Sequence, residues 1–180
     1  PGTREVVLVG GSAPYDRDLL NLVRQEIEGA FPWKVREAEA STPDAIAAEL
    51  SQLSPGTIAL FTTFFKDSAG VTYIPKRVVE RISEDSAVPV FALYDTMFDT
   101  GTTGVAATPF FEHGRSLGNL LERIAEGETL SEIDQVLPTE PRFLFDARAM
   151  RRYGMDIGAL PDPVEVFFEK PRLIESHPVA

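Results

Sequence analysis

Apolar runs alternate with amphipathic stretches along the first half of the chain. The runs are short, uninterrupted and rich in Val, Ile and Phe, which is typical of parallel strands buried on both faces. Between them, apolar residues recur at helical spacing. This pattern predicts strands over residues 6–9, 57–63 and 88–93, and helices over residues 16–30, 42–53 and 75–83. A weaker signal predicts a second strand over residues 33–38. The order β-α-β-α-β-α-β implies a three-layer α/β/α fold with a mostly parallel sheet of flavodoxin-like or Rossmann-like type.

The second half of the chain has a less regular pattern. It predicts a strand over residues 105–108, an amphipathic helix over 112–126, a strand over 142–145, a short helix over 146–153, a last strand over 165–168 and a fraying end over 176–180. Asp16 and Asp146 are suitable N-caps for the first and the short helix, because a carboxylate accepts hydrogen bonds from free backbone N–H groups. Gly154 is a suitable C-cap. We expect a single domain over residues 1–180, with its β-α core in residues 1–104.

The most informative stretch is residues 88–104, V-P-V-F-A-L-Y-D-T-M-F-D-T-G-T-T-G. Its apolar run ends abruptly in Tyr94, Asp95 and Thr96, which should lie at the carboxyl end of a buried strand. In open α/β sheets ligands bind at that edge, because the loops that leave the strands converge there. The loops after the first and third predicted strands should reach the same edge with Ser12, Tyr15, Asp16 and residues 62–67. We therefore expect a site wall here.

The residue types in these loops favour recognition over catalysis. Carboxylates can hold an ammonium group, hydroxyls can fix a ligand's orientation, and aromatic rings can enclose an apolar body. Apart from Lys66, no His, Cys or Lys accompanies the hydroxyls to activate a nucleophile. The alternative is that these polar loops bind nothing and that Asp95 only caps its own turn.

Composition and charge exclude several classes of partner. The net charge of −11 argues against a nucleic-acid surface and against contact with an anionic membrane. The chain has no Cys, and its two His, His113 and His177, lack the spacing of metal ligands. No apolar run approaches the roughly 20 residues of a membrane span. The start at Pro1, without Met, is typical of a piece cut from a longer protein.

Known enzyme motifs do not fit the glycine-rich turn after the first strand. Gly10-Gly11-Ser12 matches neither a phosphate-binding loop nor G-x-G-x-x-G, and Ser12 is not in a G-x-S-x-G elbow. We therefore expect no cofactor and no metal. The other conspicuous residues have bland interpretations: His113 on the surface, the aromatic pairs Phe64-Phe65 and Phe110-Phe111 packed rather than lining a site, and a solvated helix face of Arg148, Arg151 and Arg152.

Three stretches resemble a known family. They are V-V-L-V-G-G-S-A-P-Y-D-R-D-L-L near the start, V-P-V-F-A-L-Y-D-T in the middle, and F-D-A-R-A-M-R-R-Y-G-M-D-I-G-A-L-P followed by V-F-F-E-K-P near the end. Together they resemble the second lobe of a type I periplasmic substrate-binding protein. The resemblance is to the ABC-type substrate-binding branch that serves as the extracytoplasmic sensor of some bacterial sensor histidine kinases.

The resemblance implies a clam-shell receptor that closes on a small ligand between two lobes. It implies no catalysis in this chain, a parent protein that is a histidine kinase, and a periplasmic or extracytoplasmic position in an inner-membrane protein. The ligand would be amino-acid-like or aromatic. The first lobe is missing here, so the crossing helix must pack on its own sheet or on a neighbouring molecule, which makes a homodimer one possible arrangement. The cleft-facing positions implied are Ser12, Tyr15, Thr63, Asp67, Tyr94 and Asp95.

Three other interpretations remain open at this point. The chain could be the solute-binding component of an ABC transporter, or a small hydrolase or transferase on a flavodoxin-like scaffold. It could also be a structural dimerisation lobe that binds no ligand. Turnover that is lost on changing Asp95 or Ser12 would favour the enzyme.

Overall fold

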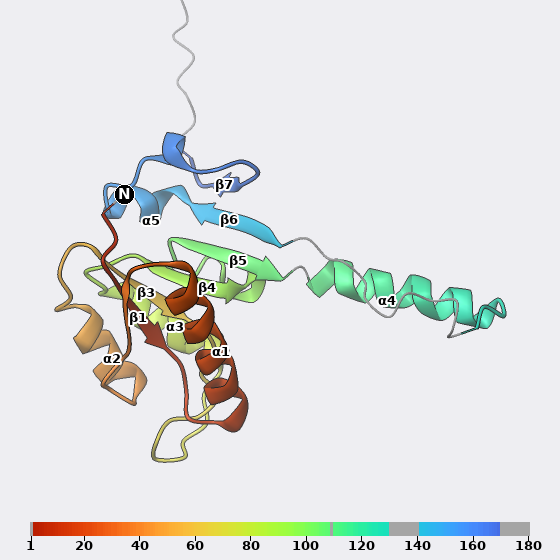
Figure 1. Ribbon diagram of the computed structural model, residues 1–180, viewed down its shortest axis with the longest axis horizontal. Coiled ribbons are helices and arrows are strands. Elements are labelled where there is room, and N and C mark those ends of the chain that lie inside the picture. Colours follow the sequence, from red (N-terminus) through yellow and green to blue (C-terminus); the bar gives the residue numbers. More distant parts are fainter. Residues whose placement is uncertain (1, 109, 130–140, 170–180) are drawn as a thin grey trace, which may run out of the picture.

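The computed structural model describes residues 2–108, 110–129 and 141–169 (Figure 1), and in these ranges it has one seven-stranded sheet. The strand order is β2-β1-β3-β4-β5-β6-β7. The strands are β1 Glu5–Val9, β2 Lys34–Glu37, β3 Thr57–Phe61, β4 Val90–Tyr94, β5 Gly104–Thr108, β6 Arg142–Asp146 and β7 Glu165–Phe167. The helices are α1 Pro14–Ala30, α2 Pro43–Leu50, α3 Pro75–Glu84, α4 Phe110–Ala125 and α5 Ala147–Arg152, with 3₁₀ turns η1 Asp95–Met97 and η2 Ile157–Ala159.

The sheet confirms the predicted mostly parallel α/β fold. Neighbouring strands pair in parallel except β5 and β6, which are antiparallel with Gly104 opposite Phe145. The order β2-β1-β3-β4-β5 is that of flavodoxin-like sheets, in which the chain reverses direction of winding between β1 and β3. The carboxyl ends of β1, β3 and β4 therefore share one edge, and the loops after β1 and β3 meet there.

Alternate residues of β1 face the two helical layers. Val6 and Leu8 pack with Leu20 of α1 on one face, and Val7 and Val9 belong to the larger core under α2 and α3 on the other. All are fully buried, which explains the uninterrupted apolar run, since a central parallel strand is covered on both sides. Burial of each such side chain contributes about 1.5–3 kcal/mol.

Three of the helices begin with proline, and one of these starts corrects a sequence prediction. Pro14, Pro43 and Pro75 occupy the first turn of α1, α2 and α3, where the missing N–H is not needed. Asp16 is therefore not the N-cap of α1. The N-cap is Ala13, and the carboxylate of Asp16 accepts a hydrogen bond from the Ala13 N–H at 3.2 Å.

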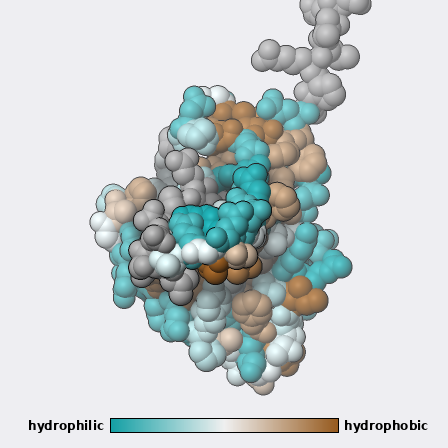
Figure 2. All heavy atoms as spheres, turned by 90° about the vertical axis from the view of Figure 1, so that its right-hand side faces the viewer, coloured by the Kyte–Doolittle hydropathy of each residue, from teal (hydrophilic) through white to brown (hydrophobic). Residues whose placement is uncertain are grey.

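Helix α4 extends away from the sheet and does not pack on it (Figure 1). None of its described side chains is buried, and Phe111, Leu117 and Leu121 are more than half exposed. Figure 2 views this side of the molecule and shows hydrophobic residues at the surface among hydrophilic ones. The chain leaves β5 and re-enters β6 at the same edge, because these strands are antiparallel neighbours. Of the two expected arrangements, packing of this helix on its own sheet was wrong, and packing on a neighbouring molecule stays a prediction.

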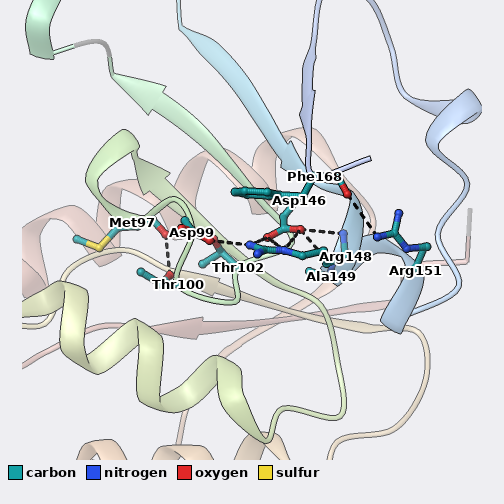
Figure 3. Close-up of polar contacts among 9 residues, drawn as sticks. All are labelled: Met97, Asp99, Thr100, Thr102, Asp146, Arg148, Ala149, Arg151 and Phe168. Atoms are coloured by element: carbon teal, nitrogen blue, oxygen red, sulfur yellow. Dashed lines mark hydrogen bonds and ion pairs between the residues drawn. The ribbon is translucent and has the colours of Figure 1, made fainter. Parts of the chain in front are cut away.

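The D-A-R motif at residues 146–148, part of the family resemblance, binds the C-terminal part of the chain to the loop before β5 (Figure 3). Asp146 is the N-cap of α5, as expected, and accepts from the Arg148 N–H at 2.8 Å. The Arg148 guanidinium forms ion pairs of 2.6 Å with both Asp146 and Asp99 and lies 3.6 Å over the ring of Phe168. These bonds join α5 to the loop before β5 and to the residue after β7.

A second arginine of α5 binds the end of another helix. Arg152 donates to the carbonyl oxygens of Ser83, Glu84 and Ser86 at 2.9–3.2 Å, and so satisfies acceptors left open where α3 ends. Arg148, Arg151 and Arg152 are all exposed, as expected of a solvated helix face, but Arg148 and Arg152 also bind other segments. Except for Asp146, the partners of Arg148 and Arg152 lie far away in the sequence, so no local pattern predicts them.

Candidate functional site: an aromatic hollow at the carboxyl edge of the sheet

A hollow of about 200 Å³ lies at the carboxyl edge of the sheet, beside the first residue of α4. It is open to solvent, since Tyr15, Phe65 and Phe110 each remain about half exposed. Its walls come from the starts of α1, α3 and α4, from the loop after β3, and from the end of β4 with η1. The lining residues are Tyr15, Thr63, Phe65, Pro75, Tyr94, Thr96, Met97 and Phe110.

Four of the eight described lining residues are aromatic. Tyr15 meets Phe65 edge to face with centroids 6.3 Å apart, and Tyr94 stacks on Phe110 at 5.9 Å. The hydroxyls of Tyr15 and Tyr94 lie 3.1 Å apart, within hydrogen-bond distance. The expectation that the doubled phenylalanines only pack holds for Phe64, which is buried, and was wrong for Phe65 and Phe110.

The hydroxyl of Tyr94 is held in its neutral form. Burial raises its pKa most, and the hydrogen bond with Tyr15 raises it further, to about 12. A neutral phenol can both donate and accept a hydrogen bond. The pair therefore contributes polar groups to the hollow without adding charge at physiological pH.

Thr63 supplies a buried hydroxyl without a partner. It is 4% exposed, and within the described part of the chain its Oγ1 has no hydrogen-bond partner. Leaving a buried polar group unsatisfied costs about 1–3 kcal/mol. Thr63 lines the hollow, but because its Oγ1 is buried, a molecule bound there could satisfy this oxygen only after the loop that follows β3 moves.

Ser12 and Asp67 use their polar groups to hold loops together. The Ser12 hydroxyl donates to the Asp67 carbonyl at 2.5 Å and contacts the Lys66 carbonyl at 3.2 Å. The Asp67 carboxylate accepts from the N–H groups of Ala69 and Val71 and from the Tyr73 hydroxyl at 2.9–3.0 Å. Burial would raise the pKa of Asp67, but these hydrogen bonds outweigh it and lower the pKa.

The same two residues line a different hollow, of about 280 Å³, beside β2. Its polar wall includes Arg17 and Glu37, which form an ion pair at 2.6 Å. The six candidates are thus divided. Tyr15, Thr63 and Tyr94 line the aromatic hollow, whereas Ser12 and Asp67 line the second one.

Asp95 lines neither hollow, although it follows Tyr94 directly. It is the first residue of η1, and its carbonyl accepts from the Phe98 N–H at 2.9 Å. Its side chain does not cap that turn, and Oδ1 is buried without a hydrogen-bond partner in the described part of the chain. The interpretation of Asp95 as a turn cap was therefore wrong.

Sequence reasoning missed part of the aromatic wall. Pro75, Met97 and Phe110 line the hollow but were assigned to a helix start, a loop and a packed pair. A signal was present for Phe110, because it stands just after a predicted strand that should end at the same edge. Pro75 and Met97 lie at the hollow only because folding brings the start of α3 and the turn η1 to it, which no local sequence pattern predicts.

The described ranges contain no group of three or more His, Asp or Glu side chains placed to hold a metal ion. No described helix has the length and apolar character needed to cross a membrane.

Comparison with solved structures identifies the fold. The ligand-free, open structure of CD0873, a substrate-binding protein with adhesive properties from Clostridium difficile, matches with a TM-score of 0.71 and 14% identity. The ABC domain in complex with L-Trp from Streptococcus pneumonia matches with a TM-score of 0.62 and 12% identity. The chain has the fold of one lobe of a type I periplasmic binding protein.

This lobe covers only part of the proteins it matches. The match takes in 94% of this chain but 56% of CD0873, and 92% of this chain but 57% of the ABC domain. A conserved domain protein from Vibrio cholerae matches with a TM-score of 0.61 and 13% identity, over 90% of this chain and 52% of that one. No protein-family model and no curated protein matches the sequence.

Proposed function

We propose that this lobe binds a small amino-acid-like or aromatic compound in the aromatic hollow, as half of a two-lobed receptor. The observation that carries the proposal is the buried Thr63 hydroxyl, which has no hydrogen-bond partner among the described residues, in a wall that also holds four aromatic rings. Rings enclose a flat apolar body, and a few polar groups fix its orientation, which is the usual composition of a small-molecule site. The neighbour crystallised with L-Trp supports the same ligand class.

The polar groups suit a compound with both a ring and hydrogen-bonding substituents. The Thr63 hydroxyl can accept or donate, and the Tyr15–Tyr94 pair can do both. Asp95 stands directly after Tyr94, and its Oδ1 is buried without a hydrogen-bond partner among the described residues. A movement of η1 on closure would bring this carboxylate to a ligand ammonium group. We assign no catalytic step to these residues.

The second half of the site comes from a first lobe that packs against α4. The match covers only 56% of CD0873 and 57% of the ABC domain, which supports a further lobe beside this one. The first lobe would bury the exposed side chains of Phe111, Leu117 and Leu121. The hollow beside the start of α4 would then lie between the two lobes. Closure of the lobes over the ligand is the signal.

Hydrogen exchange tests this packing. We expect the amides of α4 to exchange rapidly in this chain and to become protected in a longer protein that includes the proposed first lobe. Equal exchange in both would contradict the first lobe. Protection of α4 in this chain that grows with protein concentration would instead indicate a homodimer through the same face.

For the cellular role we propose the extracytoplasmic sensor of a membrane-bound histidine kinase, on the family resemblance of the three sequence stretches. The second candidate is a solute carrier for an ABC transporter, because CD0873 is described as a substrate-binding protein. Ligand-dependent phosphorylation of a kinase on the same polypeptide would support the sensor. Ligand uptake without such a kinase would support the transporter.

A thermal-shift screen against amino acids, purines, sugars and small carboxylates tests ligand binding. A ligand at about 100 times its Kd stabilises the folded state by roughly 2.7 kcal/mol. We expect the shift to fall in Thr63→Val and Asp95→Ala. Thr57→Val is the matched control, because Thr57 is also buried. Thr57 is the first residue of β3, whereas Thr63 lies just beyond the last residue of that strand. An equal loss in the control, or no shift with any compound, would count against the proposal.

A further inference from the structure

A buried carboxylate joins two of the loops that form the aromatic hollow. Asp16 is fully buried, and its Oδ2 accepts hydrogen bonds from the Ala13 N–H at 3.2 Å and the Phe65 N–H at 3.0 Å. Ala13 precedes α1, and Phe65 lies in the loop after β3. One oxygen atom therefore fixes the distance between these two segments.

The residues beside this junction are lining residues, whereas Asp16 itself is not. Tyr15 precedes Asp16 in α1, and Phe65 is the residue whose N–H the carboxylate accepts. Their rings meet edge to face across the hollow. If the Phe65 N–H loses its acceptor on Asp16, we expect the contact between the Tyr15 and Phe65 rings to be lost before any other part of the wall changes.

The close approach of the chain to Asp16 is permitted by a glycine. A Cβ at Gly11 would lie 2.3 Å from the Asp16 Oδ2 and 2.7 Å from the Lys66 carbonyl. The loops are also joined without Asp16, because the Gly11 N–H donates to the Thr63 carbonyl at 2.9 Å and the Ser12 N–H to the Lys66 carbonyl at 2.7 Å. Loss of the carboxylate should therefore displace the rings locally and leave the fold standing.

The other oxygen of the carboxylate is not used by the fold. Oδ1 of Asp16 is buried and has no hydrogen-bond partner in the described part of the chain. A buried unsatisfied oxygen destabilises the folded state, so fold stability alone does not account for a carboxylate here. The requirement is for one acceptor at the Oδ2 position.

We propose that Asp16 is a positioning residue of the aromatic hollow: it holds the Tyr15 and Phe65 rings in edge-to-face contact and thereby sets the shape of the wall against which a flat ligand packs. This inference rests on the proposed function. Asp16 does not touch the ligand, and its effect passes through the Phe65 backbone and the start of α1.

The test compares Asp16→Ala with Asp16→Asn. Alanine removes the acceptor, whereas asparagine can keep an amide oxygen at the Oδ2 position and place its NH₂ group where Oδ1 has no partner. Glu49→Ala is the matched control, because Glu49 also accepts from two loop N–H groups, those of Glu39 and Ala40 at 2.9 and 3.1 Å, beside the second hollow.

The first readout needs no ligand. Nuclear Overhauser effects between the Tyr15 and Phe65 rings should be present in the unchanged chain, in Asp16→Asn and in Glu49→Ala, and absent in a folded Asp16→Ala. Their persistence in Asp16→Ala would overturn the proposal, whatever the protein binds. If Asp16→Ala does not fold, their loss in a folded Asp16→Gly or Asp16→Ser decides in its favour and their persistence against it.

The second readout uses L-tryptophan as the probe. We expect its affinity to fall by about tenfold or more in Asp16→Ala and to stay within about threefold in Asp16→Asn and Glu49→Ala, since only the first removes the acceptor for the Phe65 N–H. An equal fall in Glu49→Ala would reduce the effect to general destabilisation and overturn the positioning role. If the unchanged chain does not bind the probe, the proposed ligand class fails while the ring contact still decides the role of Asp16.

Discussion

The hydroxyl oxygens of Tyr15 and Tyr94 lie 3.1 Å apart and join the first turn of α1 to the end of β4. The two residues are far apart in the sequence, and each also contacts a phenylalanine of the hollow. Tyr15 meets Phe65, and Tyr94 stacks on Phe110. This pair therefore connects both aromatic contacts of the wall into one surface.

Replacing Tyr15 with Phe should lower the pKa of Tyr94. Burial remains the larger cause of the raised value of about 12, so we expect a partial return toward 10. The titration of Tyr94 can be followed by NMR with carbon-labelled tyrosine. Tyr153→Phe is the control, because Tyr153 bonds to the Ser86 carbonyl outside the hollow. An unchanged Tyr94 titration in Tyr15→Phe would contradict the hydrogen bond.

The same shift predicts a loss of stability in alkali. Because the pKa of Tyr94 is raised on folding, the folded state holds this proton more tightly than the unfolded state does. The contribution is fully present below pH 10 and is lost as the pH rises through about 12. Denaturant unfolding across this range should show a smaller decline in Tyr94→Phe, and an identical decline would count against the assignment.

Removing the Arg148 guanidinium should loosen the C-terminal part of the sheet. Arg148→Met breaks two ion pairs and leaves the buried Asp146 without its cation, so we expect a loss of about 1–3 kcal/mol in the free energy of unfolding. The change can be measured by urea unfolding. Arg77→Met is the control, since its ion pair with Glu80 is exposed and worth less than about 1 kcal/mol. An equal loss of unfolding free energy in both variants would contradict a larger contribution from the two ion pairs of Arg148.

Asp146 should also make the protein sensitive to acid. Burial would raise its pKa, but hydrogen bonds from Arg148 and Ala149 outweigh this and lower the pKa. A lowered pKa contributes stability that is present above the unfolded value of about 4 and is lost as the pH falls through the folded value. In Asp146→Asn the acid-induced loss of stability should shrink. An unchanged acid profile in this variant would contradict the prediction.

Substituting the glycine beside Asp16 should distort the β1 loop. A methyl group at Gly11 would overlap the Asp16 carboxylate and the Lys66 carbonyl, so Gly11→Ala should destabilise the chain by about 1–3 kcal/mol. Gly118→Ala in α4 meets open space and should instead favour the helix by about 1 kcal/mol. Thermal unfolding and the helix signal in circular dichroism distinguish the two, and the same sign for both would contradict the contact.

Local sequence patterns carried the architecture of the first half of the chain. Uninterrupted apolar runs marked β1, β3 and β4, and Pro43 and Pro75 marked the starts of α2 and α3. Asp146 was recognised as an N-cap because capping depends on residues that are neighbours in the sequence. The edge that carries the hollow was also predictable, since the carboxyl ends of parallel strands must lie together.

The tertiary structure alone decided what the polar residues at that edge do. Ser12 carries a hydroxyl as Thr63 does, and Asp67 carries a carboxylate. The hydrogen bonds of Ser12 and Asp67 are taken by loop groups, whereas the Thr63 hydroxyl has no partner in the described part of the chain. A hydroxyl or carboxylate is available to a ligand only when no nearby protein group binds it. The donors and acceptors nearest to these loop residues come from segments brought together by folding, as the Phe65 N–H is brought to Asp16. Sequence spacing therefore fixed the edge of the sheet, and packing of distant loops fixed which side chains remain free there.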